Sequence, residues 1–464
     1  MLTSRTTYAY PASLNQEGLL LSEEASGTRA RFRAPHFPVA CRILGRVDRR
    51  ALELALGDIA QRHDSLRTSF KRTDWYSPRD RAMQLTLYRR TALWVPGLFQ
   101  QHVDDATAIP LTERYLDCYD ELAIGRAVDD EIDEAFLCDN PHRPRAVLVH
   151  AEPDVCVLVL VVSHVLTDGW SAQILQRELM TLYTARLRDE DGPLALPSAQ
   201  SYGEFAMAQY AQIVSGELAD AERYWLREWT ELEDSVVRRR DLPFARRRPA
   251  PPAMRRRVHT LAGDGSSALV ELARRLRTTP YALARTAFII VLHTYTGKRR
   301  IALWANFANR DTVAEGLVGH CSNTHLVAVL VDPAGSCAAL ARRVTAALLD
   351  AQAHQALPVA ALWRHTGRNL AAQCDSRINF DYVRELTAGG DAFQPAAVAG
   401  GRRWMDLDVR LRQGAAGFAL QATNNSNRYV DEGVADLLAS VQSVLSYWHG
   451  CDTATVGSCA ALIR

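Results

Sequence analysis

Several features that would assign this chain to a specialised class are missing from its 464 residues. No window approaches the roughly 18 uninterrupted apolar residues that a membrane-spanning helix needs. The N-terminus, Met1 to Tyr8, lacks a basic stretch followed by an apolar one, so no secretory leader is predicted. The formal net charge is only +1, which gives no bulk electrostatic reason to expect nucleic acid or an acidic membrane as a partner. We therefore expect a cytoplasmic protein.

The sequence also lacks C-x-x-C pairs and contains very few lysines. The nine cysteines are an odd number and form no C-x-x-C pair, and several lie in apolar runs, as Cys156 does. This pattern favours buried, reduced thiols over a metal site or a disulfide framework, so we expect no bound metal. Of the 54 basic residues only Lys71 and Lys298 are lysine, and the arginines are spread over the whole length. A GC-rich bacterial genome accounts for that bias better than a phosphate-binding patch.

The length predicts more than one core. A chain of 464 residues with an apolar fraction of 48% is an ordinary globular protein of two or three domains. The polar, proline-containing stretch 188–200 has the composition of a linker. We therefore predict an N-terminal lobe at 1–187, a linker at 188–200 and a C-terminal lobe at 201–464.

Both halves alternate strand-like and helix-like patterns, which favours α/β lobes. Residues 146–150 and 155–162 are predicted as paired strands, and 47–63 as a helix with Asp48 as its N-cap. Helices are also predicted at 171–187 and within 202–233. In the second half, strands are predicted near 255–261, 300–307, 325–331, 376–383, 403–412 and 417–423, and helices near 266–277, 280–296, 337–353 and 430–448.

The most informative motif follows the apolar run 155–162. That strand delivers His164, with Asp168 four residues on and Gly169 beside it. Histidine has the unperturbed pKa nearest neutrality, so an imidazole fixed at a strand end can accept or steer a proton. Alone the signal is weak, because a chain with 13 histidines gives a chance His-x-x-x-Asp-Gly roughly once in twenty such chains. A structural histidine is the competing interpretation.

Further motifs make the chain resemble the condensation domains of nonribosomal peptide synthetases, within the chloramphenicol-acetyltransferase-like superfamily. The family's His-His-x-x-x-Asp-Gly-Trp-Ser motif appears here as Ser163-His-Val-Leu-Thr-Asp-Gly-Trp-Ser171. Other family elements are matched in order, from about residue 11 to about 450: Ser13–Leu19, Arg62–Phe70, Tyr202–Gln209, Tyr224–Glu228, Thr296–Asn306, Asn309–Arg310 and Gly319–Thr324. Six or seven matches in family order are too many to be accidental.

The resemblance implies a fold and a reaction. It implies two chloramphenicol-acetyltransferase-like lobes in a V shape, with an active-site tunnel between them. An acyl thioester on the phosphopantetheine arm of a carrier protein would enter one mouth, and an amine or alcohol the other. No cofactor bound by the enzyme is needed, because the thioester is already activated. The chain ends where such a domain ends and shows no adenylation or carrier motif, so we expect a free-standing monomer that meets its carrier in trans.

The resemblance also implies roles for individual residues. His164 matches the catalytic histidine, as a base or an orienting group. Asp168 matches an aspartate that pairs with an arginine of the second lobe, and Arg310 is the candidate partner. Gly169 is expected to permit a turn that a β-carbon would obstruct. The residues expected along the tunnel or near the substrate are Ser163, Trp170, His320 and Asn323, although core packing is the favoured interpretation for Trp170.

Three departures from the family pattern suggest a specialised member. Ser163 replaces the first motif histidine, Pro141-His-Arg-Pro-Arg145 replaces a Gly-Pro-Leu-Leu-Arg stretch, and His320 stands where phenylalanine is usual. The alternatives left open are an ester-forming acyltransferase that uses a carrier or coenzyme A donor, a non-catalytic recruitment domain, and an epimerase of the same fold. The intact His164–Asp168–Gly169 pattern argues against recruitment.

Overall fold

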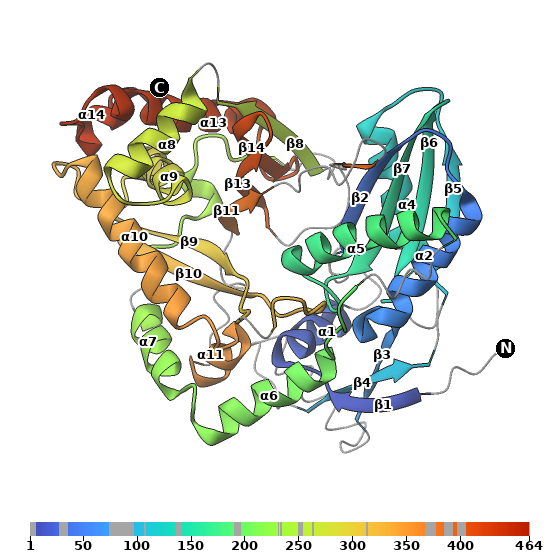
Figure 1. Cartoon of the computed structure of the whole chain (residues 1–464). Coiled ribbons are helices and arrows are strands. Elements are labelled where there is room, and N and C mark those ends of the chain that lie inside the picture. The colour runs from blue at the N-terminus through green and yellow to red at the C-terminus, as the bar shows by residue number, and fades with distance from the viewer. Residues whose placement is uncertain are drawn as a thin grey trace.

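The computed structural model describes the chain apart from residues 1–5, 27–35, 74–96, 106–107, 136–141, 190–195, 231, 233, 249–253, 262–263, 312–313, 367–376, 385–392, 397–404 and 464. Apart from one short strand, its two large sheets come from different halves of the chain, and helices surround both sheets (Figure 1). Part of the predicted linker, 190–195, lies outside the described residues, as do Cys138 and Cys374.

The first large sheet has five strands in the order β12-β2-β7-β6-β5. Its strands are β2 (His36–Leu44), β5 (Leu111–Tyr115), β6 (Arg145–Glu152), β7 (Val155–Ser163) and β12 (Phe393–Pro395). Every residue of β7 is buried, because both faces of the sheet are covered. Its even-numbered side chains pack with α2 (Arg49–Arg62) and α5 (Gly169–Leu187), and its odd-numbered ones with α4 (Glu121–Ala135).

A smaller sheet in the order β1-β4-β3 lies below the first in Figure 1. Its strands are β1 (Thr6–Pro11), β3 (Thr68–Arg72) and β4 (Phe99–Asp104). Helix α6 (Tyr202–Ser215) contacts β1, and α1 (Leu14–Ser26) contacts α11 (Val359–Thr366) of the second half. Segments from both halves therefore meet at this end of the molecule.

The second large sheet has six strands in the order β10-β9-β11-β13-β14-β8. They are β8 (Met254–Thr260), β9 (Arg300–Phe307), β10 (Asn323–Leu330), β11 (Ile378–Arg384), β13 (Leu407–Gly414) and β14 (Gly417–Asn425). Besides α6 and α11, the described helices of this half are α7 (Ala219–Thr230), α8 (Gly265–Arg275), α9 (Pro280–Thr296), α10 (Cys337–Ala353), α13 (Asp431–Gly450) and α14 (Val456–Ala460).

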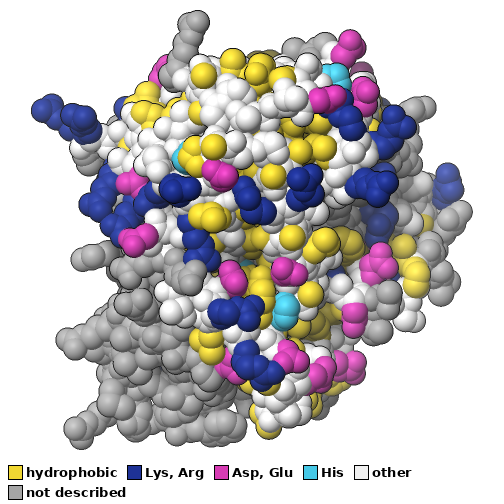
Figure 2. Space-filling view, turned by 90° about the vertical axis from the view of Figure 1, so that its left-hand side faces the viewer, with side chains coloured by type: hydrophobic (Ala, Val, Ile, Leu, Met, Phe, Trp, Pro, Cys, Tyr) yellow, Lys and Arg dark blue, Asp and Glu magenta, His cyan; other side chains and the backbone are white. Residues whose placement is uncertain are grey.

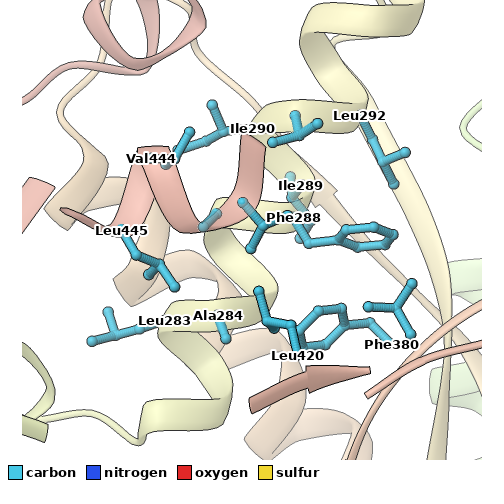
Figure 3. Packing of buried hydrophobic residues seen from close by; sticks show 14 of the residues in the cluster. Leu283, Ala284, Phe288, Ile289, Ile290, Leu292, Phe380, Leu420, Val444 and Leu445 are labelled. Atoms are coloured by element: carbon cyan, nitrogen blue, oxygen red, sulfur yellow. The ribbon is translucent and has the colours of Figure 1, made fainter. Parts of the chain in front are cut away.

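Helix α9 is the centre of the second core. All its residues from 282 to 292 are buried, because the helix is apolar there except at Arg285 and Thr286 and contacts α8, α10, α13 and the sheet. Phe288 lies against Phe380 of β11, and Val444 and Leu445 of α13 pack from another side (Figure 3). Each large side chain buried this way contributes about 1.5–3 kcal/mol. This core covers one face of the sheet, and on the other face Ala302, Trp304 and Leu326 pack in a second hydrophobic cluster.

The predicted elements agree with the structure in their positions. The paired strands near 146–162 are β6 and β7, the six strands of the second half are present, and Asp48 caps α2 by accepting a hydrogen bond from the Ala51 amide. The pairing of β12 with β2 was not predicted, and it joins a strand from the second half to the first sheet.

On the face shown in Figure 2, basic side chains form a row across the upper half, and most acidic side chains lie below it or at its edge, with apolar ones between them. No helix in the described part of the chain is both long enough and apolar enough to cross a membrane.

Candidate active site

His164 is placed by the junction between β7 and α5. Strand β7 ends at Ser163, a turn closes with the Leu166 amide donating to the Ser163 carbonyl, and α5 begins at Gly169. Asp168 is the N-cap of α5, and its carboxylate accepts a hydrogen bond from the Ser171 amide at 2.8 Å. A buried strand and a capped helix thus fix the loop that carries the imidazole.

The hydrogen bonding of His164 determines which of its ring nitrogens carries the proton. Nδ1 lies 2.7 Å from the Thr167 carbonyl oxygen, which can only accept, so Nδ1 carries the hydrogen and Nε2 is left as an acceptor. Burial lowers the pKa of His164 and outweighs the Thr167 bond and the charge of Asp168, which raise it. The ring lines a cavity and is only partly buried. A neutral imidazole with an available Nε2 is the form that can accept a proton.

A second imidazole lies against the first. The ring centroids of His164 and His320 are 4.3 Å apart, and Phe37 contacts His164 edge-on at 4.7 Å. Burial lowers the pKa of His320 far below its usual value, and its Nδ1 is buried without a hydrogen-bond partner in the described structure. Two neutral imidazoles therefore share one wall of the cavity.

Asp168 and Arg310 form a buried ion pair between the two halves of the chain. Two parallel hydrogen bonds of 2.9 Å join the guanidinium to the two carboxylate oxygens, and the two side chains are only 2% and 1% exposed. Burial alone would raise the pKa of Asp168, but the charge and hydrogen bonds of Arg310 hold it below the usual range. Asp168 is therefore ionised and serves as an anchor, with no proton to give in catalysis.

The same carboxylate fixes the loop that carries His320. Asp168 also accepts hydrogen bonds from the amides of Cys321 and Ser322, and the Tyr202 hydroxyl donates to the His320 carbonyl at 2.7 Å. A β-carbon at Gly319 would lie 1.9 Å from the Tyr202 ring, so this position requires glycine. The anchor thus sets the positions of both histidines.

Behind the catalytic loop, Ser163 contacts another histidine. The Ser163 hydroxyl lies 3.0 Å from Nδ1 of His142, and His142 Nε2 lies 3.5 Å from a carboxylate oxygen of Glu23. Burial lowers the pKa of His142 to about 4, so its ring is neutral. Ser163 itself is 1% exposed and faces the buried ring of His142.

The cavity has a volume of about 210 Å³ and takes its walls from both halves of the chain. Its lining residues are Asn15, Gly18, Leu19, His36, Phe37, Pro38, His164, Trp304, Asn306, His320, Ser322, Thr324, Val359, Ala360, Arg377, Asn379, Met405, Asp408 and Arg410. Among the described residues, no three His, Cys, Asp or Glu side chains gather in a way that would hold a metal ion.

The tunnel residues predicted from the sequence fall in different places. His320 lines the cavity, whereas Ser163, Trp170 and Asn323 are outside its lining. Asn323 is buried, donates to the Gln355 carbonyl and accepts from Asn15, so it supports the wall from behind. Trp170 is 41% exposed and donates to the Glu315 carbonyl, so the expectation that it packs in the core was wrong.

The steric reason given for Gly169 was also wrong. A β-carbon at this position would meet no atom within 4 Å, and Gly169 is not among the residues with positive φ. Gly169 is an exposed first residue of α5, a position that other residues adopt without strain. Nothing in the local packing demands glycine there.

Sequence reasoning missed the polar wall that the second sheet contributes to the cavity. Asn306, Asn379, Asp408 and Arg410 are lining residues on strands that were predicted, but no role was assigned to them. The available signal was the alternation of polar with apolar residues along β9, β11 and β13, since one face of each strand packs on α9.

Comparison with known proteins accords with this geometry. The model of the family described as "Condensation domain" matches residues 7–386. Phosphinothricin tripeptide synthetase PhsC of Streptomyces viridochromogenes is 30% identical over 315 residues, which are 66% of this chain and 26% of that protein. N-(5-amino-5-carboxypentanoyl)-L-cysteinyl-D-valine synthase of Amycolatopsis lactamdurans is 27% identical over 448 residues, 94% of this chain and 11% of that protein. The chain thus spans only a small part of these relatives.

Among solved structures, a mutant of the starter condensation domain of rhizomide synthetase RzmA, in complex with C8-CoA, superimposes with a TM-score of 0.74. Its sequence is 17% identical, and the match covers 97% of each chain, so this likeness speaks to the fold alone. The fold is therefore the α/β architecture seen in solved condensation domains. On the extent of the family match, this chain belongs to the condensation-domain family of nonribosomal peptide synthetases.

Proposed function

We propose that this protein joins an acyl or aminoacyl thioester, held on the phosphopantetheine of a carrier protein, to an amine acceptor in natural-product biosynthesis. It would act on its carrier in trans. The observation that carries the proposal is the neutral His164, whose Nδ1–H is held by Thr167 while Nε2 remains available in a cavity walled by both halves of the chain. Membership of the condensation-domain family supports this choice of reaction.

The reaction balances without a metal or an enzyme-bound cofactor. The acceptor nitrogen attacks the thioester carbonyl carbon, the C–N bond forms, the C–S bond breaks, and the carrier thiol leaves. One proton passes from the nitrogen, by way of His164 Nε2, to the leaving sulfur. Holding both reactants in one cavity supplies the orientation that contributes much of the rate.

In this proposal Asp168 and Arg310 position groups and take no part in proton transfer. Their buried ion pair joins the first half to the loop of His320, so it fixes the position of the His320 ring relative to that of His164. Gly169 and Ser163 flank the same loop, the first on the surface and the second in contact with His142.

Ester formation on a hydroxyl, from a carrier or coenzyme A donor, is the second candidate. The observation that favours it is the pair of neutral imidazoles, His164 and His320, because an alcohol needs a base whereas a neutral amine needs mainly orientation. The C8-CoA complex of RzmA supports coenzyme A thioesters as donors to test.

Matched acceptors separate these candidates. Carrier-bound and coenzyme A octanoyl thioesters are offered with amines and with the corresponding alcohols, and products are identified by mass spectrometry. We expect amide from a carrier-bound donor, and a loss of roughly 100-fold or more in His164→Ala. His449→Ala, at a half-buried position in the last turn of α13 outside the cavity lining, is the matched control. Full activity of His164→Ala in a reconstituted pathway would instead indicate a recruitment role.

A further inference from the structure

The second sheet presents a polar face to the cavity of His164. In the strand register Thr324 pairs with Asn306, Asn379 with Asp408 and Asp381 with Arg410. Asn379 also pairs with Trp304 of β9, which places Asp381 beside Asn306 in the next row of the same face. We call this the polar face, and its residues are Trp304, Asn306, Thr324, Asn379, Asp381, Asp408 and Arg410. All except Asp381 line the cavity.

Hydrogen bonds along each row hold these side chains in fixed positions. Thr324 donates to Asn306 at 2.8 Å, and Asn306 donates to Asp381 at 2.9 Å. In the neighbouring row Asn379 donates to Asp408 at 3.0 Å, and Arg410 lies 2.7 Å from the other oxygen of Asp408. A preorganised set of this kind loses little conformational entropy when a ligand binds.

Three atoms of the polar face are buried without a hydrogen-bond partner in the described structure. They are Oδ1 of Asn379, Nε of Arg410 and Nε1 of Trp304. The orientation of the Asn379 amide is fixed, because its nitrogen donates to the Asp408 carboxylate. One unmet acceptor therefore lies beside two unmet donors, and a buried polar group without a partner favours any ligand that supplies one.

Charge does not select an ion here. Asp381 and Asp408 are matched by two guanidinium groups, those of Arg410 on the face and Arg377 on the cavity wall. A hydroxyl group meets the unmet donors and the unmet acceptor equally well, because it both donates and accepts. The indole of Trp304 is only 4% exposed and packs with the core behind these polar atoms, so it contributes its unmet Nε1–H.

We propose that the polar face binds the acceptor substrate, and that this acceptor is a small polyhydroxylated ring bearing an amine, of the amino sugar or aminocyclitol class. Its hydroxyls bind Asn306, Asn379 and Arg410, and its amine faces His164. The reaction of that amine rests on the proposed function above, whereas its binding does not. Binding is therefore measured separately from turnover.

The test uses saturation-transfer NMR and competition with four probes: glucosamine, 2-deoxystreptamine, cyclohexylamine and cyclohexanol. No thioester is present. We expect at least one of the two polyhydroxylated amines to bind ten-fold or more tightly than cyclohexylamine. Equal or tighter binding of the two simple rings would overturn the proposal, and so would the absence of saturation transfer to every probe.

Variants locate the binding. Thr324→Val is nearly isosteric and should weaken binding of the amino polyol at least three-fold, and Asn306→Leu should weaken it ten-fold without weakening that of cyclohexylamine. Thr260→Val, on an exposed position of β8 in the same sheet, is the matched control. Unchanged binding in folded Thr324→Val and Asn306→Leu proteins would overturn the assignment.

Turnover then distinguishes the two proposals. Polyol binding that depends on the polar face, without any product from carrier or coenzyme A thioesters, would leave the subsite standing and reject the condensation. Product formation from cyclohexylamine at the same kcat/KM as from the amino polyols would support the condensation reaction and reject the polyol-binding subsite.

Discussion

The imidazole of His142 faces the hydroxyl of Ser163, with 3.0 Å between Nδ1 and Oγ. Both residues lie where this chain departs from the family pattern, since Ser163 replaces a motif histidine and His142 belongs to the altered stretch before β6. The two departures therefore meet at one contact. An imidazole lost at position 163 has a counterpart supplied from position 142, directly behind the loop that carries His164.

This contact predicts that positions 142 and 163 are energetically coupled. Ser163→His should destabilise the protein by about 1–3 kcal/mol, because a second ring enters a site where Ser163 is only 1% exposed. Adding His142→Ala should restore part of that loss by making room for the new ring. Urea denaturation of the two single variants and the double variant gives the coupling energy. Additive effects of the two substitutions would contradict the prediction.

The Asp168–Arg310 pair predicts a large penalty when one partner is removed. Asp168→Ala should lower the free energy of unfolding by about 3–5 kcal/mol, because the guanidinium, 2% exposed, is left without its counterion. Asp168→Leu combined with Arg310→Met should cost less than Asp168→Ala, since no charge remains buried. Chemical denaturation of the three proteins measures this order. If Asp168→Ala were as stable as the double variant, the ion pair would not be what holds the two halves together at this point.

Much of the fold was predictable because local patterns agree with it. Strand β7 is an unbroken apolar run covered on both faces, and α9 begins after Thr279, whose side chain caps it, and ends at Gly297 in a left-handed conformation. These signals lie within a few residues of the elements that they define. The pairing of β12 with β2 has no such signal, because it depends on how distant segments meet.

In the candidate site, too, contacts between distant segments could not be predicted from local sequence patterns. The motif supplied His164, and the resemblance supplied Asp168 and Arg310, whose contact joins residues 142 positions apart. The polar face was missed because its members come from four strands, and only the strand register places them side by side. Trp170 was misjudged because an aromatic residue predicts burial by its type, whereas its position on α5 faces solvent.

The open space at Gly169 predicts tolerance to substitution. Gly169→Ala should leave the free energy of unfolding within about 0.5 kcal/mol of the parent, because the new β-carbon meets no atom within 4 Å. Gly319→Ala, on the facing loop, is the informative contrast, since its β-carbon would overlap the Tyr202 ring. Thermal denaturation compares the two. Destabilisation of Gly169→Ala by more than about 1 kcal/mol would contradict the structure.

The protonation of His164 predicts the pH dependence of activity. Burial lowers its pKa below 6.5, so Nε2 is available at neutral pH and is lost when the ring becomes protonated in acid. The acid limb of kcat/KM for an alcohol acceptor should therefore fall below pH 6.5. An amine acceptor should add a second limb at higher pH, from its own ammonium group. A limb that persists in His164→Gln would assign the titration to another group.

Buried neutral histidines predict how stability depends on pH. Burial lowers the pKa of His142 to about 4 and that of His325 to about 3, and both lie below the value near 6.5 of an unfolded chain. Below pH 6.5 the unfolded chain thus binds more protons than the folded one. Stability is complete above pH 6.5 and falls as the pH drops toward 4, by up to about 1.4 kcal/mol per pH unit for each histidine.

Urea denaturation at pH 7.5, 6.5, 5.5 and 4.5 measures this slope. His325→Gln should flatten it by about one proton, because the ring stacked on Trp225 at 4.0 Å no longer titrates. Carboxylates held at low pKa, such as Asp168, lose their contribution only at more acidic pH, so they do not produce a loss between pH 6.5 and 5.5. A flat profile across that interval would mean that these histidines are protonated in the folded protein.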